Sequence, residues 1–101
     1  MTELNLYKPQ LIKICNELHV AKLFVFGSVA DGTSTEDSDI DFLLSFLPSL
    51  SPENYSDNFF ELHYRLKELL NRDVDITTEN SLSNPYFIQS VEASKRIIYE
   101  A

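Results

Sequence analysis

Apolar residues along the chain recur with a helical period in three segments. We expect a helix over about Pro9–Leu18, a longer one over about Pro52–Leu70, and a third that begins at Asn84-Pro85 and runs to about Ser94. Each segment starts at a proline, whose fixed φ and missing amide hydrogen suit the first helical turn. The apolar stripe of the longest segment consists of Tyr55, Phe59, Leu62, Leu66 and Leu69.

Other segments combine β-branched and aromatic residues and are expected to be strands. They are Lys22–Phe26, Ser38–Phe46, Arg72–Thr78 and a short terminal stretch over Arg96–Tyr99. Between the first two, Ser28–Asp37 predicts one turn of helix followed by a polar loop. Helices and strands in this order predict an α/β or α+β fold, with helices packed on a small sheet.

The composition narrows the class of protein. The 101 residues, of which 44% are hydrophobic, suit one domain over residues 1–101 with a core of its own. Sixteen acidic and eight basic residues give a net charge of −8, which disfavours binding to a nucleic-acid backbone or to anionic lipid. The single cysteine, Cys15, excludes an internal disulfide and a cysteine-rich zinc site, and we expect it in the core.

Membrane and secretory segments are not expected. No apolar run reaches the roughly 20 residues of a membrane span. The N-terminus lacks the basic start and the apolar run of a secretory signal. Together with the lone cysteine, these features predict a cytoplasmic protein.

Two aspartates stand at the start of the second expected strand. Because side chains alternate along a strand, Asp39 and Asp41 are expected to share one face while their apolar neighbours point to the other. Like charges so close together repel unless a cation lies between them, and Mg²⁺ prefers carboxylate oxygens. Asp75, between two apolar residues of the third strand, supplies a third carboxylate if the two strands are neighbours.

These aspartates also allow other interpretations. Ser38-Asp39 is typical of a turn, in which case the strand begins at Ile40. Asp73 alternates in step with Asp75 and competes with it as the third carboxylate. We prefer Asp75 because its apolar neighbours place it deeper, and we expect Asp73 on a solvated strand edge.

Gly27-Ser28 ends the first strand and opens the expected turn of helix. Free amide groups at such a turn can hold a phosphate, and glycine lets the backbone come close while the Ser28 hydroxyl adds a donor. The spacing over residues 27–34 is superficially that of a P-loop, but Thr33 stands where that motif requires lysine. We therefore reject the P-loop interpretation.

Gly27-Ser28, then Asp39-Ile40-Asp41, and then Val74-Asp75-Ile76 after an intervening helix resemble the nucleotidyltransferase superfamily of the DNA polymerase β type. Within that superfamily the chain more closely resembles the minimal nucleotidyltransferases, which are antitoxins of HEPN-domain toxins, and the resemblance covers about residues 10–99. This resemblance implies an α+β fold with a small mixed sheet flanked by helices. It also implies Mg²⁺-dependent transfer of a nucleoside monophosphate, usually AMP from ATP, to a tyrosine hydroxyl of the toxin.

The same resemblance implies roles for single residues. Asp39 and Asp41 would ligate the metal, Asp75 would be the third ligand and activate the attacking hydroxyl, and Gly27 and Ser28 would bind the triphosphate. One departure concerns Asp31, which stands where the family commonly has a basic residue. An aspartate near a triphosphate would repel it, whereas one that points outward would change little.

Three functions are consistent with these residues. The leading hypothesis is a nucleotidyltransferase that modifies a HEPN-type toxin. The alternative is a weak or inactive binding module that neutralises its partner by association, which Asp31 and the small size favour. A small-molecule nucleotidyltransferase is disfavoured because no residues remain for the extra helical lobe of such enzymes. A catalytic lobe this small leaves its site open on one side, so we also expect a homodimer or a complex.

The aromatic residues of the longest helix allow two interpretations. We expect them mainly in the core, with a partner-binding patch at one end of the helix as the alternative. These residues are Tyr55, Phe59, Phe60 and Tyr64.

Overall fold

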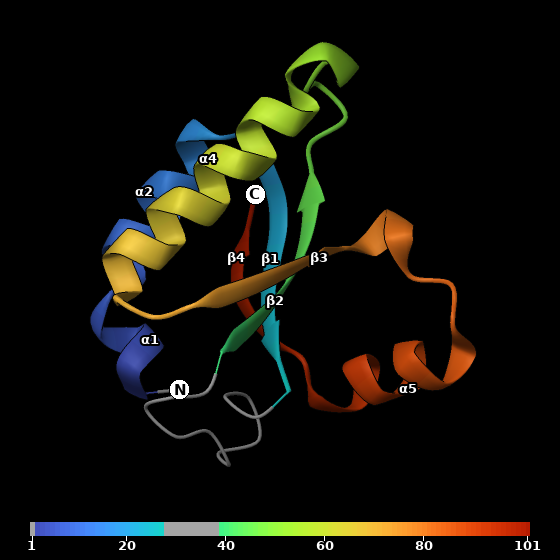
Figure 1. Ribbon diagram of the computed structural model, residues 1–101. Coiled ribbons are helices and arrows are strands. Elements are labelled where there is room, and N and C mark those ends of the chain that lie inside the picture. Colours follow the sequence, from blue (N-terminus) through green and yellow to red (C-terminus); the bar gives the residue numbers. More distant parts are fainter. Residues whose placement is uncertain (1, 28–38) are drawn as a thin grey trace.

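The computed structural model of the chain describes residues 2–27 and 39–101 (Figure 1). In chain order its elements are α1 (Thr2–Leu6), α2 (Lys8–Glu17), β1 (Val20–Phe26), β2 (Ile40–Phe46), α4 (Pro52–Leu70), β3 (Val74–Thr78), the 3-10 helix η1 (Glu79–Ser81), α5 (Pro85–Ser94) and β4 (Arg96–Glu100). The described residues thus form a small sheet flanked by helices, which confirms the expected α+β class.

The strands form a mixed sheet in the order β3-β2-β1-β4. β1 is antiparallel to both β2 and β4, whereas β2 and β3 are parallel. Two parallel strands need a connection that brings the chain back to the end of the sheet where the first strand began, and α4 provides this connection between β2 and β3. The crossing helix thereby sets how β3 lies against β2.

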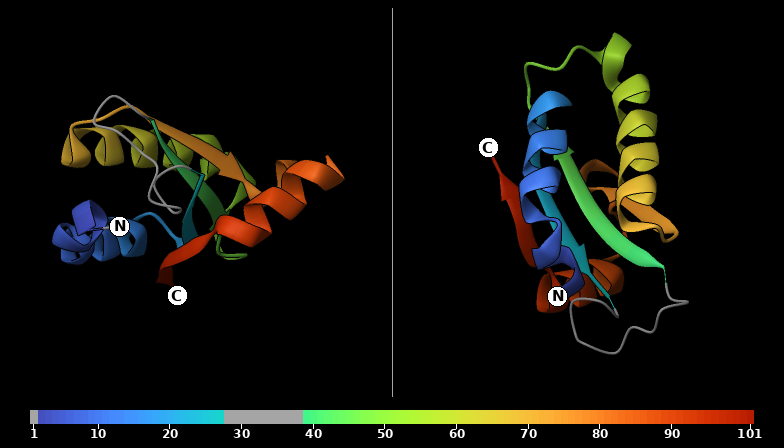
Figure 2. Two further views of the ribbon diagram at one scale, coloured as in Figure 1. Left: turned by 90° about the horizontal axis from the view of Figure 1, so that it is seen from below. Right: turned by 90° about the vertical axis from the view of Figure 1, so that its left-hand side faces the viewer.

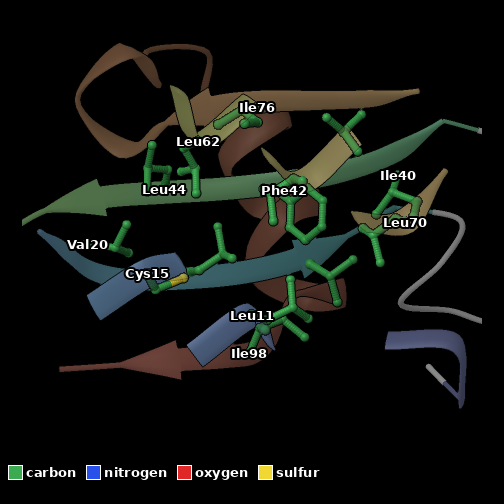
Figure 3. Packing of buried hydrophobic residues seen from close by; sticks show 14 of the residues in the cluster. Leu11, Cys15, Val20, Ile40, Phe42, Leu44, Leu62, Leu70, Ile76 and Ile98 are labelled. Carbon is green, nitrogen blue, oxygen red and sulfur yellow. The ribbon is translucent and has the colours of Figure 1, made fainter. Parts of the chain in front are cut away.

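The main core lies between the sheet and the helices α2 and α4, which cover the same face (Figure 2). Figure 3 shows side chains of this core; those labelled are Leu11, Cys15, Val20, Ile40, Phe42, Leu44, Leu62, Leu70, Ile76 and Ile98. Burial raises the pKa of the Cys15 thiol to about 12, so it stays protonated at neutral pH. Cys15 is therefore a core residue, as expected.

The opposite face of the sheet is covered in part by α5 (Figure 1). Val91 of this helix belongs to a second buried cluster with Phe26 and Leu43 of the sheet. Phe87 meets the ring of Phe26 edge to face, with the ring centroids 6.0 Å apart. This smaller contact fixes the C-terminal helix beside the end of β1.

The three expected helices are present. α4 has the expected bounds, and α5 is capped by Asn84, whose side chain accepts hydrogen bonds from the amides of Tyr86 and Phe87. The short helix α1 was not expected. Among the described helices, none is long and apolar enough to span a membrane.

The strand bounds differ from those expected, and one difference concerns the site. The strand predicted from Ser38 begins at Ile40, as the alternative interpretation had it, so Asp39 lies just before the strand. The reason is that β1 ends at Phe26, which pairs with Asp41, leaving Asp39 beyond the last rung of the sheet. Ser38 lies outside the described residues, so the turn at Ser38-Asp39 stays a prediction. The turn of helix predicted over Ser28–Asp37 lies outside the described residues.

Candidate functional site

Asp41 and Asp75 lie directly opposite each other on the parallel strands β2 and β3. Side chains of opposite residues point to the same face of a sheet, and neighbouring strands lie about 4.8 Å apart. On the other side Asp41 pairs with Phe26, which shares a buried cluster with Val91 of α5. The two carboxylates therefore lie on the α5 side of the sheet, away from α2 and α4.

The electrostatic state of Asp41 reflects these neighbours. Partial burial raises the pKa of its carboxyl group, and the negative charges of Asp75 and Asp39 raise that pKa further. Among the described residues, none of these three carboxylates takes part in an ion pair. The end of the sheet therefore carries concentrated negative charge that a bound cation would relieve.

Gly27 brings the backbone close to Asp41. Its φ is +71°, and a Cβ atom at this position would lie 2.7 Å from Oδ2 of Asp41. Its amide donates a long hydrogen bond of 3.4 Å to Oγ of Ser94, in the last turn of α5. Nothing in the sequence singles out Ser94, because this contact joins residues 67 positions apart.

The sequence-predicted residues are thus brought together in part. Asp41, Asp75 and Gly27 converge, and Asp39 is exposed just before β2. Ser28 and Asp31 lie outside the described residues.

Burial does not distinguish Asp75 from Asp73, because both residues are exposed. The position of Asp75 opposite Asp41 distinguishes it instead. Asp73 pairs with Lys67 of α4 at 3.2 Å, which directs its carboxylate toward the helix-covered side.

The donor set has the chemistry that Mg²⁺ requires, because carboxylate oxygens are its preferred protein ligands. Within residues 2–27 and 39–101, however, no three His, Cys, Asp or Glu side chains are close enough together to hold a metal ion. Asp39 and Asp75 are exposed, and exposed side chains change rotamer within nanoseconds. The three aspartates are thus suitable ligands for Mg²⁺ and lie at the same end of the sheet. The side chains of Asp39 and Asp75 would have to rotate toward Asp41 to bind one ion together.

The chain is similar in sequence to known nucleotidyltransferases. Residues 8–98 match the nucleotidyltransferase domain family. A protein of Methanocaldococcus jannaschii, named as a candidate protein adenylyltransferase, is 38% identical over 73 residues, which are 72% of this chain and 71% of the relative.

Solved structures show the same fold. One described as a candidate minimal nucleotidyltransferase has a TM-score of 0.75 and 29% identity, over 92% of this chain and 90% of that chain. A complex between a tri-AMPylated HEPN toxin and an MNT antitoxin of Shewanella oneidensis contains a chain with a TM-score of 0.65 and 21% identity. That match covers 97% of this chain and 73% of the other.

The raised pKa of Asp41 predicts how stability depends on pH in the absence of divalent cations. The folded chain holds the Asp41 proton more tightly than the unfolded chain does, so ionisation of this group destabilises the fold. This penalty is absent below the pKa of an unfolded aspartate, about 3.9, and is complete once the pH exceeds the raised value. Asp41→Asn should therefore raise Tm near neutral pH in EDTA and lose this advantage as the solution is acidified.

Thermal unfolding followed by circular dichroism across this pH range measures the effect. Asp73→Asn is the matched control, because it removes a carboxylate that pairs with Lys67 and should give no such gain. An Asp41→Asn variant that is less stable than wild type at neutral pH would contradict the claim that the ionised Asp41 carboxylate destabilises the fold.

Gly27→Ala should destabilise the fold and displace the Asp41 carboxylate. The left-handed φ costs a residue with a side chain about 1–2 kcal/mol, and the new methyl group would meet Oδ2 of Asp41. Asparagine adopts positive φ more readily, so Gly27→Asn should recover part of the stability while still displacing the carboxylate. Urea denaturation measures the first effect, and the NMR shift of the Asp41 carboxyl carbon measures the second. Wild-type values for both in Gly27→Ala would show that neither constraint exists.

Proposed function

Because the chain belongs to the nucleotidyltransferase domain family and is a nucleotidyltransferase, we propose that it transfers AMP from ATP to a hydroxyl group of a HEPN-domain toxin and so acts as an antitoxin. The observation that carries this proposal is the register that sets Asp41 opposite Asp75 beside Gly27. The name of the archaeal relative supports AMP as the transferred group, and the AMPylated HEPN complex supports the partner.

In this proposal Asp39, Asp41 and Asp75 would hold Mg²⁺, which when bound supplies neutralising charge for the phosphate groups. Gly27 lets the Asp41 carboxylate lie against the backbone at the end of β1, where a side chain would collide with it. The Gly27 amide, which makes a long hydrogen bond to Ser94, and the Ser28 hydroxyl would donate to the triphosphate. These groups position the substrate, and positioning is a main part of catalysis in phosphoryl transfer.

The transfer needs a base that removes one proton. The toxin hydroxyl loses its proton to Asp75, and the hydroxyl oxygen forms a bond to the α-phosphorus of ATP. The bond from that phosphorus to the β-phosphate oxygen breaks, and pyrophosphate leaves. Exposure of Asp75 suits this role, because a proton acceptor for a protein substrate must be reachable from outside.

Two labelled nucleotides test this function. With Mg²⁺ and a purified HEPN-domain protein of the same organism, label from [α-³²P]ATP should become attached to the HEPN protein and label from [γ-³²P]ATP should not. Asp75→Asn should lower the rate by about 100-fold or more, the order expected for loss of one preorganised catalytic group. Asp73→Asn, just before the same strand, should retain the wild-type rate.

Equal labelling by wild type and by the Asp39→Ala, Asp41→Ala double variant would refute the proposed site. Tight binding of the HEPN protein without any transfer would instead identify a chain that neutralises its partner by association.

A further inference from the structure

Two large aromatic side chains are exposed on α4. Phe60 is 69% exposed and Tyr64 is 60% exposed, and they lie one helical turn apart on the outer side of the helix. The expectation that these residues belong mainly to the core is therefore wrong for both. Phe59 contacts the core instead, and its successor must point elsewhere because consecutive helical residues differ in direction by about 100°.

A hollow lies beside these aromatic residues. It has a volume of about 260 Å³ and is lined by Tyr55, Ser56, Phe59, Phe60 and Thr78. The rings of Phe59 and Phe60 are nearly perpendicular, with centroids 5.7 Å apart, so they form an angled apolar wall. We call Phe60, Tyr64 and this hollow the α4 surface.

The α4 surface is separate from the aspartates. Thr78 pairs with Leu44, three residues further along the parallel strands than the pair of Asp41 and Asp75. At about 3.3 Å per residue this places the hollow roughly 10 Å along the sheet from the carboxylates. The helix itself covers the opposite face of the sheet (Figure 2).

The charges around the hollow and Phe60 have one sign, and the one lysine near Tyr64, Lys67, is paired with Asp73. Glu53 and Asp57 precede Phe60 at helical spacing, and Glu79 follows Thr78 directly. None of these three carboxylates takes part in an ion pair within the part of the chain that the structure describes. The sequence has no lysine or arginine over residues 46–64 or 73–94. The hollow and Phe60 are therefore bordered by uncompensated negative charge.

We propose that the α4 surface docks a basic segment of a protein partner, one that inserts an apolar side chain into the hollow and pairs lysine or arginine with Glu53, Asp57 and Glu79. Charge complementarity selects this occupant. A second copy of this chain would bring another net charge of −8, and nucleic acid and anionic lipid are repelled in the same way. Exposed aromatic residues beside a pocket supply the usual anchors of protein interfaces, and the acidic border speeds the approach of a basic partner.

This inference rests on the proposed function for the identity of the partner, the HEPN-domain protein, but it does not require that AMP is transferred. Binding and transfer are therefore measured separately. The double variant Phe60→Ala, Tyr64→Ala should raise Kd for the HEPN-domain protein by about 100-fold, because it removes two aromatic anchors and each contributes about tenfold to affinity. Tyr86→Ala is the matched control, because Tyr86 is an 84% exposed aromatic residue on α5. It should leave Kd unchanged. Glu53→Gln, Asp57→Asn should slow association and weaken its dependence on salt.

Calorimetric titration gives Kd, and circular dichroism and Mg·ATP binding check that each variant is folded with its site intact. An unchanged Kd in the aromatic double variant, with transfer intact, overturns the α4 surface and leaves the proposed function standing. A raised Kd in the aromatic double variant, with the Kd of Tyr86→Ala unchanged, supports the α4 surface as the docking site. If wild type in the same experiments transfers no AMP, the proposed function is refuted although the docking site stands.

Sedimentation of the chain without a partner tests whether a second copy of the chain occupies the α4 surface. A wild-type dimer that the aromatic double variant converts to monomers would show that a second copy covers this surface, and would overturn the inference. Wild type that does not bind the HEPN protein at all contradicts both proposals.

Discussion

The parallel pairing of β2 with β3 is the interaction on which the candidate site depends, because it sets Asp41 opposite Asp75. Val74 and Ile76 on either side of Asp75 are buried under α4, so a slip of one residue would move the aspartate into the core and both apolar residues to the open face. His63 of α4 donates a hydrogen bond to the carbonyl of Val74, which helps to hold the helix against the strand. Packing of the helix-covered face thus dictates where the carboxylates on the other face lie.

This arrangement places negative charges close together, which costs free energy as long as no cation is bound. Asp41 is partly buried beside two other negative charges, and the pKa of its carboxyl group is raised as a result. The described residues supply no cation to this group, although elsewhere Asp73 pairs with Lys67 and Glu17 with Arg65. A divalent cation would supply the missing positive charge, and nucleotidyl transfer is a reaction in which such a cation also neutralises the phosphate groups of the substrate.

The sequence predicts the elements better than it predicts their contacts. The stripe of α4 and the cap at Asn84 follow from local spacing, and both are confirmed. The sequence allowed β2 to start at Ser38 or at Ile40, and the pairing of Phe26 with Asp41 decides for Ile40 and leaves Asp39 outside the strand. Ser94 reaches Gly27 through tertiary packing, and the exposure of Phe60 depends on which side of the helix meets the sheet. The roles of Ser28 and Asp31 stay predictions.

Binding of Mn²⁺ in place of Mg²⁺, followed by electron paramagnetic resonance in the presence of a non-hydrolysable ATP analogue, tests the central claim most directly. If Asp41 and Asp75 form one cation site, Asp75→Asn should weaken binding by about tenfold or more. Asp73→Asn, which removes the same charge two residues away, should bind as wild type does. Equal binding by all three proteins, or a loss confined to Asp73→Asn, would show that the β2–β3 register does not build the metal site.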